Sequence, residues 1–219
     1  THAWSLPAPL GCLALGEDGR LLLGLAKGLY ASDVEAQLSA RDLTLEKLAD
    51  VEAGDPMTRI NDGRADREGG FVFGTKSEHA DLRPAGRFYQ YTATHGLREL
   101  ALPHAAIPNS ICFDATGTRM YFCDSVTPRI LHCRYDAAAA AVSDIAMFVD
   151  LDLPGAEPDG SIIDAEGALW NAQWGAGRVV RYLADGGIDQ IVRVPAPQPS
   201  CCVLHEDTLY VTSARVGLD

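Results

Sequence analysis

Polar and apolar positions along the chain form a pattern that repeats about every 50 residues. Each copy has an apolar stretch, a polar turn that ends in glycine, and a second apolar or aromatic stretch. The four copies and their turn glycines are residues 12–23 (Gly19), 63–75 (Gly69), 111–122 (Gly117) and 162–170 (Gly167). Residues 202–212 form a fifth, shorter copy. Each copy predicts a β-hairpin, because glycine readily adopts the positive φ that a tight turn needs.

Further strand-like segments follow three of the hairpins, at 86–91, 130–135 and 178–182, and several show the alternation of a half-buried strand. Four strands repeating at this period are typical of a blade of a β-propeller. The alternative is a β-sandwich in which four turns share their spacing by chance. The repeat therefore predicts an all-β fold of the propeller type.

Two segments fit the repeat less well. Residues 34–50 are rich in helix-forming residues and are compatible with a short helix, although the repeat predicts the outer strands of a blade there. Residues 137–141 are five consecutive alanines, which we expect to form a loop or a brief helical turn.

The amino-acid composition excludes some classes of binding partner. The chain has 219 residues, 47% of them hydrophobic, with 18 basic and 30 acidic residues. A net charge of −12 argues against nucleic acid, which requires clustered Lys and Arg. No stretch approaches the roughly 20 apolar residues of a membrane span, and residues 1–16 lack Met and the basic segment of a signal peptide. We expect neither nucleic acid nor membrane as a partner, and we expect further residues upstream of Thr1.

The six cysteines form no CxxC pair, and the six histidines show no zinc-binding spacing. A disulfide framework is unusual in a chain of this size, so free thiols and a cytoplasmic location are expected.

Polar residues recur in register with the turns. Eight positions before the four turn glycines stand Gly11, Asn61, Asn109 and Asp159. In a propeller, such equivalent positions face the central channel at one end, so the two amides and the carboxylate are expected to converge. Their oxygen atoms suit Ca²⁺, Mg²⁺ or Mn²⁺. The alternative is that each is an Asx-turn residue at the start of a strand. Arg59 lies two residues before Asn61, on the same strand face, where its guanidinium can hold a hydroxyl, carboxylate or carbonyl group.

At these residues the chain resembles the gluconolactonase family that includes regucalcin (senescence marker protein). The matching segments are Arg59–Asp66 with Phe73–Thr75, Ile107–Ser110 with Met120–Ser125, Pro158–Gly160 with Asp164–Trp170 and Gly177–Tyr182, and Cys201–Cys202 with Leu209–Arg215. The resemblance extends from about Gly11 to Arg215. It implies a six-bladed β-propeller and a metal-dependent lactonase.

Residue by residue, the resemblance implies that Asn109 and Asp159 are metal ligands and that Asp159 is also the carboxylate that handles protons. Arg59 and Asn61 match the positions that contact the sugar lactone, and a further acidic contact falls at Glu78 or one residue away. One divalent ion is implied, which is Ca²⁺, Mg²⁺, Mn²⁺ or Zn²⁺.

Two features depart from the family pattern. The remaining metal ligand of the family is a Glu in a GlyGluGly-like or GlyGluSer-like motif of the first blade, and no such motif occurs here. Glu17 lies in a turn and does not receive that role. Six blades of about 50 residues need near 300 residues. We therefore expect residues 1–219 to form a single propeller domain with four full blades and part of a fifth, without the segments that close the ring at either end.

The predicted function is metal-dependent hydrolysis of a sugar lactone to the free aldonic acid, with the lactone as the small-molecule partner. The chain lacks the GxSxG motif of a serine hydrolase, and residues 175–180 lack the third glycine of a dinucleotide-binding loop. The alternatives are a non-catalytic calcium-binding regulatory propeller, a propeller hydrolase of another ester class, and a protein-binding scaffold. Gluconate-, galactonate-, arabinonate- and xylonate-type lactones are all compatible with the sequence.

Overall fold

The computed structural model describes residues 3–16 and 18–218, so Glu17 lies outside the described residues. In these ranges the chain forms eighteen strands and no helix. The strands are β1 Leu10–Leu15, β2 Leu21–Leu25, β3 Gly28–Ser32, β4 Glu46–Asp50, β5 Thr58–Ala65, β6 Phe71–Ser77, β7 Phe88–Thr92, β8 Gly96–Glu99, β9 Pro108–Phe113, β10 Arg119–Asp124, β11 Arg129–Asp136, β12 Ala141–Asp150, β13 Glu157–Ile163, β14 Leu169–Trp174, β15 Arg178–Tyr182, β16 Ile188–Arg193, β17 Pro199–His205 and β18 Thr208–Ser213.

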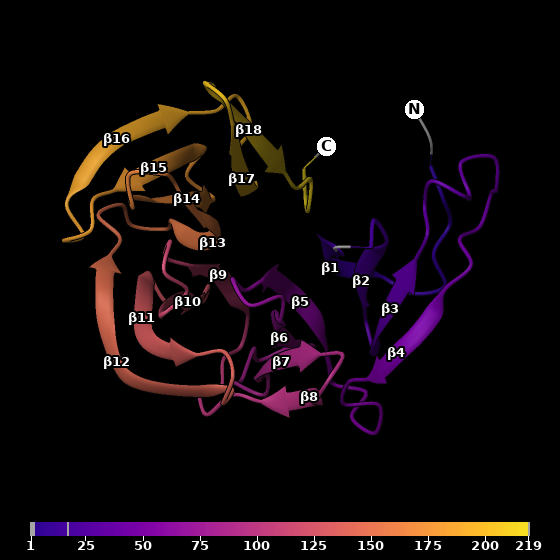
Figure 1. The fold of residues 1–219 in the computed structure, drawn as a ribbon. Helices are drawn as coiled ribbons and strands as arrows, with labels where there is room; N and C mark the ends of the chain where they lie inside the picture. Colours follow the sequence, from indigo (N-terminus) through magenta and orange to yellow (C-terminus); the bar gives the residue numbers. More distant parts are fainter. Residues whose placement is uncertain (1–2, 17, 219) are drawn as a thin grey trace.

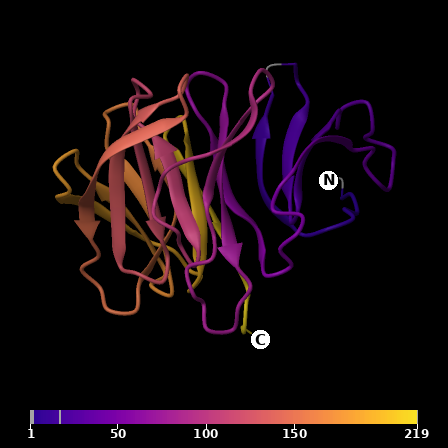
Figure 2. The same cartoon turned by 90° about the horizontal axis from the view of Figure 1, so that it is seen from below.

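Consecutive strands pair antiparallel into sheets, which are β1–β4, β5–β8, β9–β12, β13–β16 and the hairpin β17–β18. The sheets follow one another in chain order round an arc, with β1, β5, β9, β13 and β17 innermost (Figure 1). The side view shows the sheets standing next to one another along this arc (Figure 2). The all-β prediction is confirmed, and the arrangement is propeller-like.

The turn glycines behave as predicted. Gly19, Gly69, Gly117 and Gly167 all have positive φ, between 72° and 83°. Residues 34–39 form bends and turns, and Glu46–Asp50 forms the outer strand β4. Here the repeat predicted the structure correctly and helix propensity did not, because pairing with β3 and packing of Leu48 against the apolar core outweigh a preference of a few tenths of a kcal/mol per residue. Residues 137–140 form a turn, and the last alanine, Ala141, begins β12.

The core lies between neighbouring sheets, so central strands are buried on both faces. In β10, Met120 and Phe122 pack on one side, where the ring centroids of Phe122 and Phe88 lie 5.4 Å apart. Tyr121 faces the other side and packs in the cluster that contains Tyr182. The three middle sheets, β5–β8, β9–β12 and β13–β16, are held from both sides, which fixes the positions of β5, β9 and β13 relative to one another.

A buried polar cluster joins two of these sheets. The hydroxyl of Tyr135 on β11 donates to Oδ2 of Asp66 at 2.7 Å. Nε2 of Gln90 on β7 donates to the same oxygen at 3.1 Å and to the Tyr135 hydroxyl at 2.6 Å, and the Gly70 amide donates to Asp66 Oδ1 at 2.7 Å. The cluster satisfies a carboxylate that burial would otherwise penalise.

Replacing Tyr135 with Phe is expected to lower the free energy of unfolding by about 1–3 kcal/mol, because the buried Asp66 loses a hydrogen-bond donor. Chemical denaturation measures the change. The matched control is Tyr91→Phe, which removes a hydroxyl from a half-buried tyrosine of β7. Equal stabilities of the two variants would contradict the assigned role of the cluster.

Candidate functional site

The innermost strands share an irregularity near the end at which they begin. Each contains one more residue than its partner strand, a β-bulge, between Leu10 and Cys12, Ile60 and Gly63, Asn109 and Cys112, Pro158 and Ser161, and Pro199 and Cys201. A bulge bends the strand and redirects a side chain that would otherwise follow the alternation of the sheet. Five bulges at equivalent positions therefore bend the innermost strands at one level, where residues of all five line one cavity.

Four of the five predicted site residues line one cavity of about 580 Å³ in this region: Arg59, Asn61, Asn109 and Asp159. Glu78, the fifth, is joined to this group through Arg59, whose Nε donates to Glu78 Oε1 at 2.9 Å. The structure thus brings together residues that lie up to 100 positions apart in the sequence.

The two asparagines are in direct contact. Asn61 Nδ2 donates to Asn109 Oδ1 at 3.1 Å and to the Pro108 carbonyl at 3.0 Å. Asn109 Nδ2 donates to Ser125 Oγ at 2.8 Å, and the Ser125 hydroxyl donates to the Pro158 carbonyl at 2.6 Å, next to Asp159. This chain of hydrogen bonds connects β5, β9 and β13 at the level of the bulges. The polar residues in register thus share one cavity and are linked by one chain of hydrogen bonds.

Gly11, the first member of the register, carries no side chain for a physical reason. A Cβ atom there would lie 2.5 Å from the carbonyl oxygen of Ile60 and 2.7 Å from that of Asn61. The backbone of β1 therefore packs directly against the strand that carries Arg59 and Asn61, and only glycine permits this approach.

Buried hydroxyl and amide groups hold the backbone of Asp159. Its carbonyl oxygen accepts hydrogen bonds from Ser110 Oγ at 2.5 Å and from Asn171 Nδ2 at 2.9 Å. Asn171 also donates to Ser161 Oγ at 3.0 Å. Ser110 has a φ of 59°, a left-handed conformation that is uncommon for a residue other than glycine. Sequence reasoning missed Ser110 and Asn171 as positioning residues, since nothing in their local sequence reveals these contacts.

Three carboxyl groups and two cationic side chains line the cavity: Asp62, Glu157, Asp159, Arg59 and Lys76. Burial raises the pKa of Asp159 to about 8, with Asp62 and Glu157 adding to the rise and the Gly160 amide and Lys76 opposing it. Burial also raises the pKa of Asp62, with the Arg64 guanidinium opposing that shift. Asp62, Glu157 and Lys76 all line the cavity and were not predicted from the sequence.

This donor set fits a hard divalent cation. Asn109 and Asp159 offer amide and carboxyl oxygens, and a positive ion beside Asp159 would favour its ionised form. Among residues 3–16 and 18–218, no three His, Cys, Asp or Glu side chains gather as metal ligands.

Arg64 lies deeper than the cavity, between the innermost strands. Its NH2 group donates to the Ser161 carbonyl at 2.9 Å, and its Nε donates to the Ile111 carbonyl at 3.4 Å. The Ile111 amide in turn donates to Asp62 Oδ2 at 3.1 Å. Arg64 thereby ties β5 to β9 and β13 below the predicted site.

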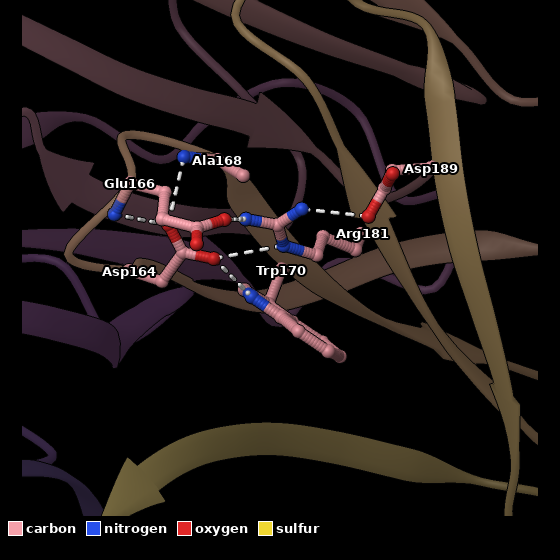
Figure 3. Close-up of polar contacts among 6 residues, drawn as sticks. All are labelled: Asp164, Glu166, Ala168, Trp170, Arg181 and Asp189. Carbon is pink, nitrogen blue, oxygen red and sulfur yellow. Dashed lines mark hydrogen bonds and ion pairs between the residues drawn. The ribbon is translucent and has the colours of Figure 1, made fainter. Parts of the chain in front are cut away.

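A second cavity of about 830 Å³ opens at the far ends of the same strands, where the hairpin turns lie. Its most prominent group is Arg181, which donates to Asp164 at 2.8 Å and to Glu166 and Asp189 at 2.6 Å each (Figure 3). The Trp170 indole donates to the same Asp164 oxygen at 2.8 Å. Burial alone would raise the pKa of Asp164, but the hydrogen bonds from Arg181 and Trp170 outweigh it and lower that pKa. All three nitrogens of the Arg181 guanidinium are paired with carboxylates, so we assign this cluster to stability.

Two tryptophans of β14 lie in different places. Trp170 is buried in the cluster with Arg181. Trp174, at the end of β14, lines the 580 Å³ cavity next to Asp159. No helix in the described part of the chain is long and apolar enough to cross a membrane.

Comparison with known proteins gives a consistent result. Residues 1–215 match the family model described as SMP-30/Gluconolactonase/LRE-like region. An L-arabinolactonase of Azospirillum brasilense is 48% identical over 98% of this chain and 70% of its own length. A sugar lactone lactonase named as putative, from Rhizobium meliloti, is 32% identical over 98% of this chain and 71% of its own. The crystal structure of a calcium-binding protein, regucalcin, from Agrobacterium tumefaciens superposes with a TM-score of 0.85 at 34% identity, covering 98% of this chain and 71% of that one.

Proposed function

Because the chain belongs to the SMP-30/gluconolactonase/LRE-like family, we propose that the 580 Å³ cavity is the active site of its lactonase activity. The chain is a sugar lactonase, an enzyme that hydrolyses a cyclic sugar ester to the aldonic acid. The assignment of the site rests on one observation. Asn61, Asn109, Asp159 and Arg59 all line the same cavity. We further propose L-arabinolactone as a substrate, since the relative at 48% identity is named an L-arabinolactonase.

The side chains that line the cavity have different roles in the proposed reaction. Asp159 takes a proton from the attacking water and returns one to the ring oxygen as the ring C–O bond breaks. Arg59 and Asn61 hold the sugar hydroxyl groups, and Glu78 keeps the Arg59 guanidinium in place through their ion pair. Ser110 and Asn171 fix the backbone from which Asp159 projects.

Asn109 and Asp159 are the proposed ligands of one divalent ion. Such an ion supplies Lewis-acid polarisation of the lactone carbonyl when bound. Oxygen donors favour Ca²⁺, Mg²⁺ or Mn²⁺ over Zn²⁺, and the likeness to a calcium-binding regucalcin supports Ca²⁺. That likeness also supports a second candidate, a calcium-binding regulatory protein without catalysis. The Arg59–Glu78 pair beside the cavity favours the enzyme, because ion binding alone requires no sugar contact.

The finer architecture also belongs to this proposal. We infer a single domain whose complete ring has six blades, of which the described sheets form four and the β17–β18 hairpin forms part of a fifth. The alignment of nearly this whole chain with about 70% of each relative supports this count. The six cysteines are free, which supports a reducing compartment such as the cytoplasm.

Arg59→Met is expected to raise KM for L-arabinolactone about tenfold, because a charge-assisted hydrogen bond to the sugar contributes on the order of 1.5–3 kcal/mol. Turnover at saturation should fall less, since Arg59 does not take part in bond breaking. Steady-state kinetics separates the two effects. The control is Arg129→Met, which removes an exposed guanidinium that pairs with Asp150 outside the cavity. An unchanged KM in the Arg59 variant would remove this residue from the site.

A further inference from the structure

Two cations stand side by side at the wall of the cavity. Arg59 on β5 and Lys76 on β6 are directly opposite partners in the antiparallel ladder, and both line the cavity. Like charges in opposite positions on neighbouring strands destabilise a sheet. The two cations therefore repel each other, and a negatively charged group bound between them would relieve this repulsion.

The two cations differ in their bonding partners. Arg59 donates to Glu78 and to its neighbouring Ile60 carbonyl at 3.1 Å. Lys76 is half-buried, and in the part of the chain that the structure describes its side chain forms no ion pair within 4 Å and no hydrogen bond. Burial lowers its pKa, with Arg59 contributing to the decrease and Glu78 and Asp159 opposing it. Its ammonium group therefore has three donors available to a molecule in the cavity.

The product of the lactonase reaction has a negative charge that suits binding to Lys76. Water adds its oxygen to the carbonyl carbon, the ring C–O bond breaks, and one proton passes to the ring oxygen. The second proton leaves the new carboxylic acid for solvent, because such acids have a pKa of roughly 3–4. A neutral lactone thus becomes a carboxylate inside a cavity that already holds Asp62, Glu157 and Asp159. Lys76 is the cation on that wall that has no carboxylate bound to it.

We propose that Lys76, beside Arg59, binds the carboxylate of the aldonate product and makes the cavity distinguish the acid from the lactone. The inference rests on the proposed active site. Charge-assisted hydrogen bonds from an ammonium to a carboxylate are stronger than those to the neutral ester oxygen of the lactone. Aldonate is therefore a competitive inhibitor whose affinity depends on Lys76 more than the affinity of the lactone does.

The test compares Lys76→Met with the wild-type full-length protein at a fixed Ca²⁺ concentration. Met keeps the length of the side chain and removes its charge. We expect the inhibition constant of L-arabinonate to rise about tenfold, while KM for L-arabinolactone changes less than threefold. Lys76→Arg restores the charge and should restore the inhibition constant to within about threefold of wild type. Lys47→Met, at an exposed lysine paired with Asp50 on β4, should leave both constants unchanged.

Calorimetry of L-arabinonate and of the uncharged L-arabinitol gives a second readout that needs no catalysis. Loss of arabinonate binding in Lys76→Met, with arabinitol unaffected, supports the proposal. Equal affinities of wild type and Lys76→Met for arabinonate overturn it, and so does an equal rise of KM and inhibition constant. Turnover of L-arabinolactone by the wild type tests the lactonase site separately, so failure of that function is told apart from failure of the carboxylate contact.

Discussion

Asp159→Asn is expected to lower kcat for L-arabinolactone by about 10³-fold, because the amide cannot take a proton from water. The substitution preserves the shape of the side chain, and the hydrogen bonds from Ser110 and Asn171 go to the backbone carbonyl, which is unchanged. The fold should therefore persist. Initial rates of acid release, followed with a pH indicator, measure the loss, and circular dichroism checks the fold.

The stability of this variant provides an independent check. In metal-free protein, burial raises the pKa of Asp159 to about 8, above the value of roughly 4 in an unfolded chain. A carboxyl group with a raised pKa destabilises the fold increasingly as the pH rises from about 4 to about 8. Asp159→Asn should therefore unfold at the same or a higher temperature than wild type at pH 7 in chelator. A lower unfolding temperature would show that Asp159 supports the fold.

Glu157→Gln is the matched control for activity. Glu157 lines the same cavity two residues earlier on β13, and the mechanism assigns it no proton transfer. Its substitution should change kcat less than about fivefold, well below the contribution of a general base. If both variants lose activity equally, the effect is one of cavity charge rather than of Asp159 as the base. If Asp159→Asn keeps more than a tenth of wild-type activity, its assignment is wrong.

Removal of the divalent ion is expected to lower turnover by about 10³-fold, since a Lewis acid contributes several kcal/mol to stabilising charge in the transition state. Exhaustive dialysis against chelator, followed by titration with Ca²⁺, Mg²⁺ or Mn²⁺, measures loss and recovery. Dialysed protein with a monovalent salt at equal ionic strength is the control.

Asn109→Ala should raise the ion concentration that restores half of the activity by at least about tenfold.

The outcomes of this titration separate the candidate functions. Full activity after complete removal of metal would contradict the metal-dependent mechanism. Calcium binding without turnover of any sugar lactone would favour the regulatory protein. A normal response of Asn109→Ala to the ion would remove the asparagine from the ligand set, and Asp159 would then need other partners.

The sequence predicted the fold to the extent that local turns determine it. Gly19, Gly69, Gly117 and Gly167 define hairpins whose conformation depends on neighbouring residues alone, and their regular spacing reflects equal sheets round an arc. The β4 segment shows the limit of local propensity. Its helix-forming residues give way to strand pairing with β3 because the sheet supplies hydrogen bonds and packing that an isolated helix there lacks.

The convergence of residues in the cavity was predictable where they share the register of the repeat. This register predicted that Asn61, Asn109 and Asp159 lie together, and Arg59 was added from its proximity to Asn61. Lys76 was not, because it comes from a second strand and its place depends on cross-strand pairing with Arg59. Ser110 was missed for another reason, since its role depends on a left-handed backbone conformation and on the carbonyl of a residue 49 positions away.

The bulges of the innermost strands have a consequence for how such proteins diversify. A residue in a bulge lies outside the regular ladder, so its identity is uncoupled from the hydrogen bonds that hold the sheet together. Evolution can exchange an amide or a carboxylate at these points one sheet at a time, as Asn61 and Asp159 illustrate, whereas Gly11 is fixed by the close approach of the Ile60 carbonyl. The same scaffold can thereby acquire new specificities through single substitutions, without first having to recover lost stability.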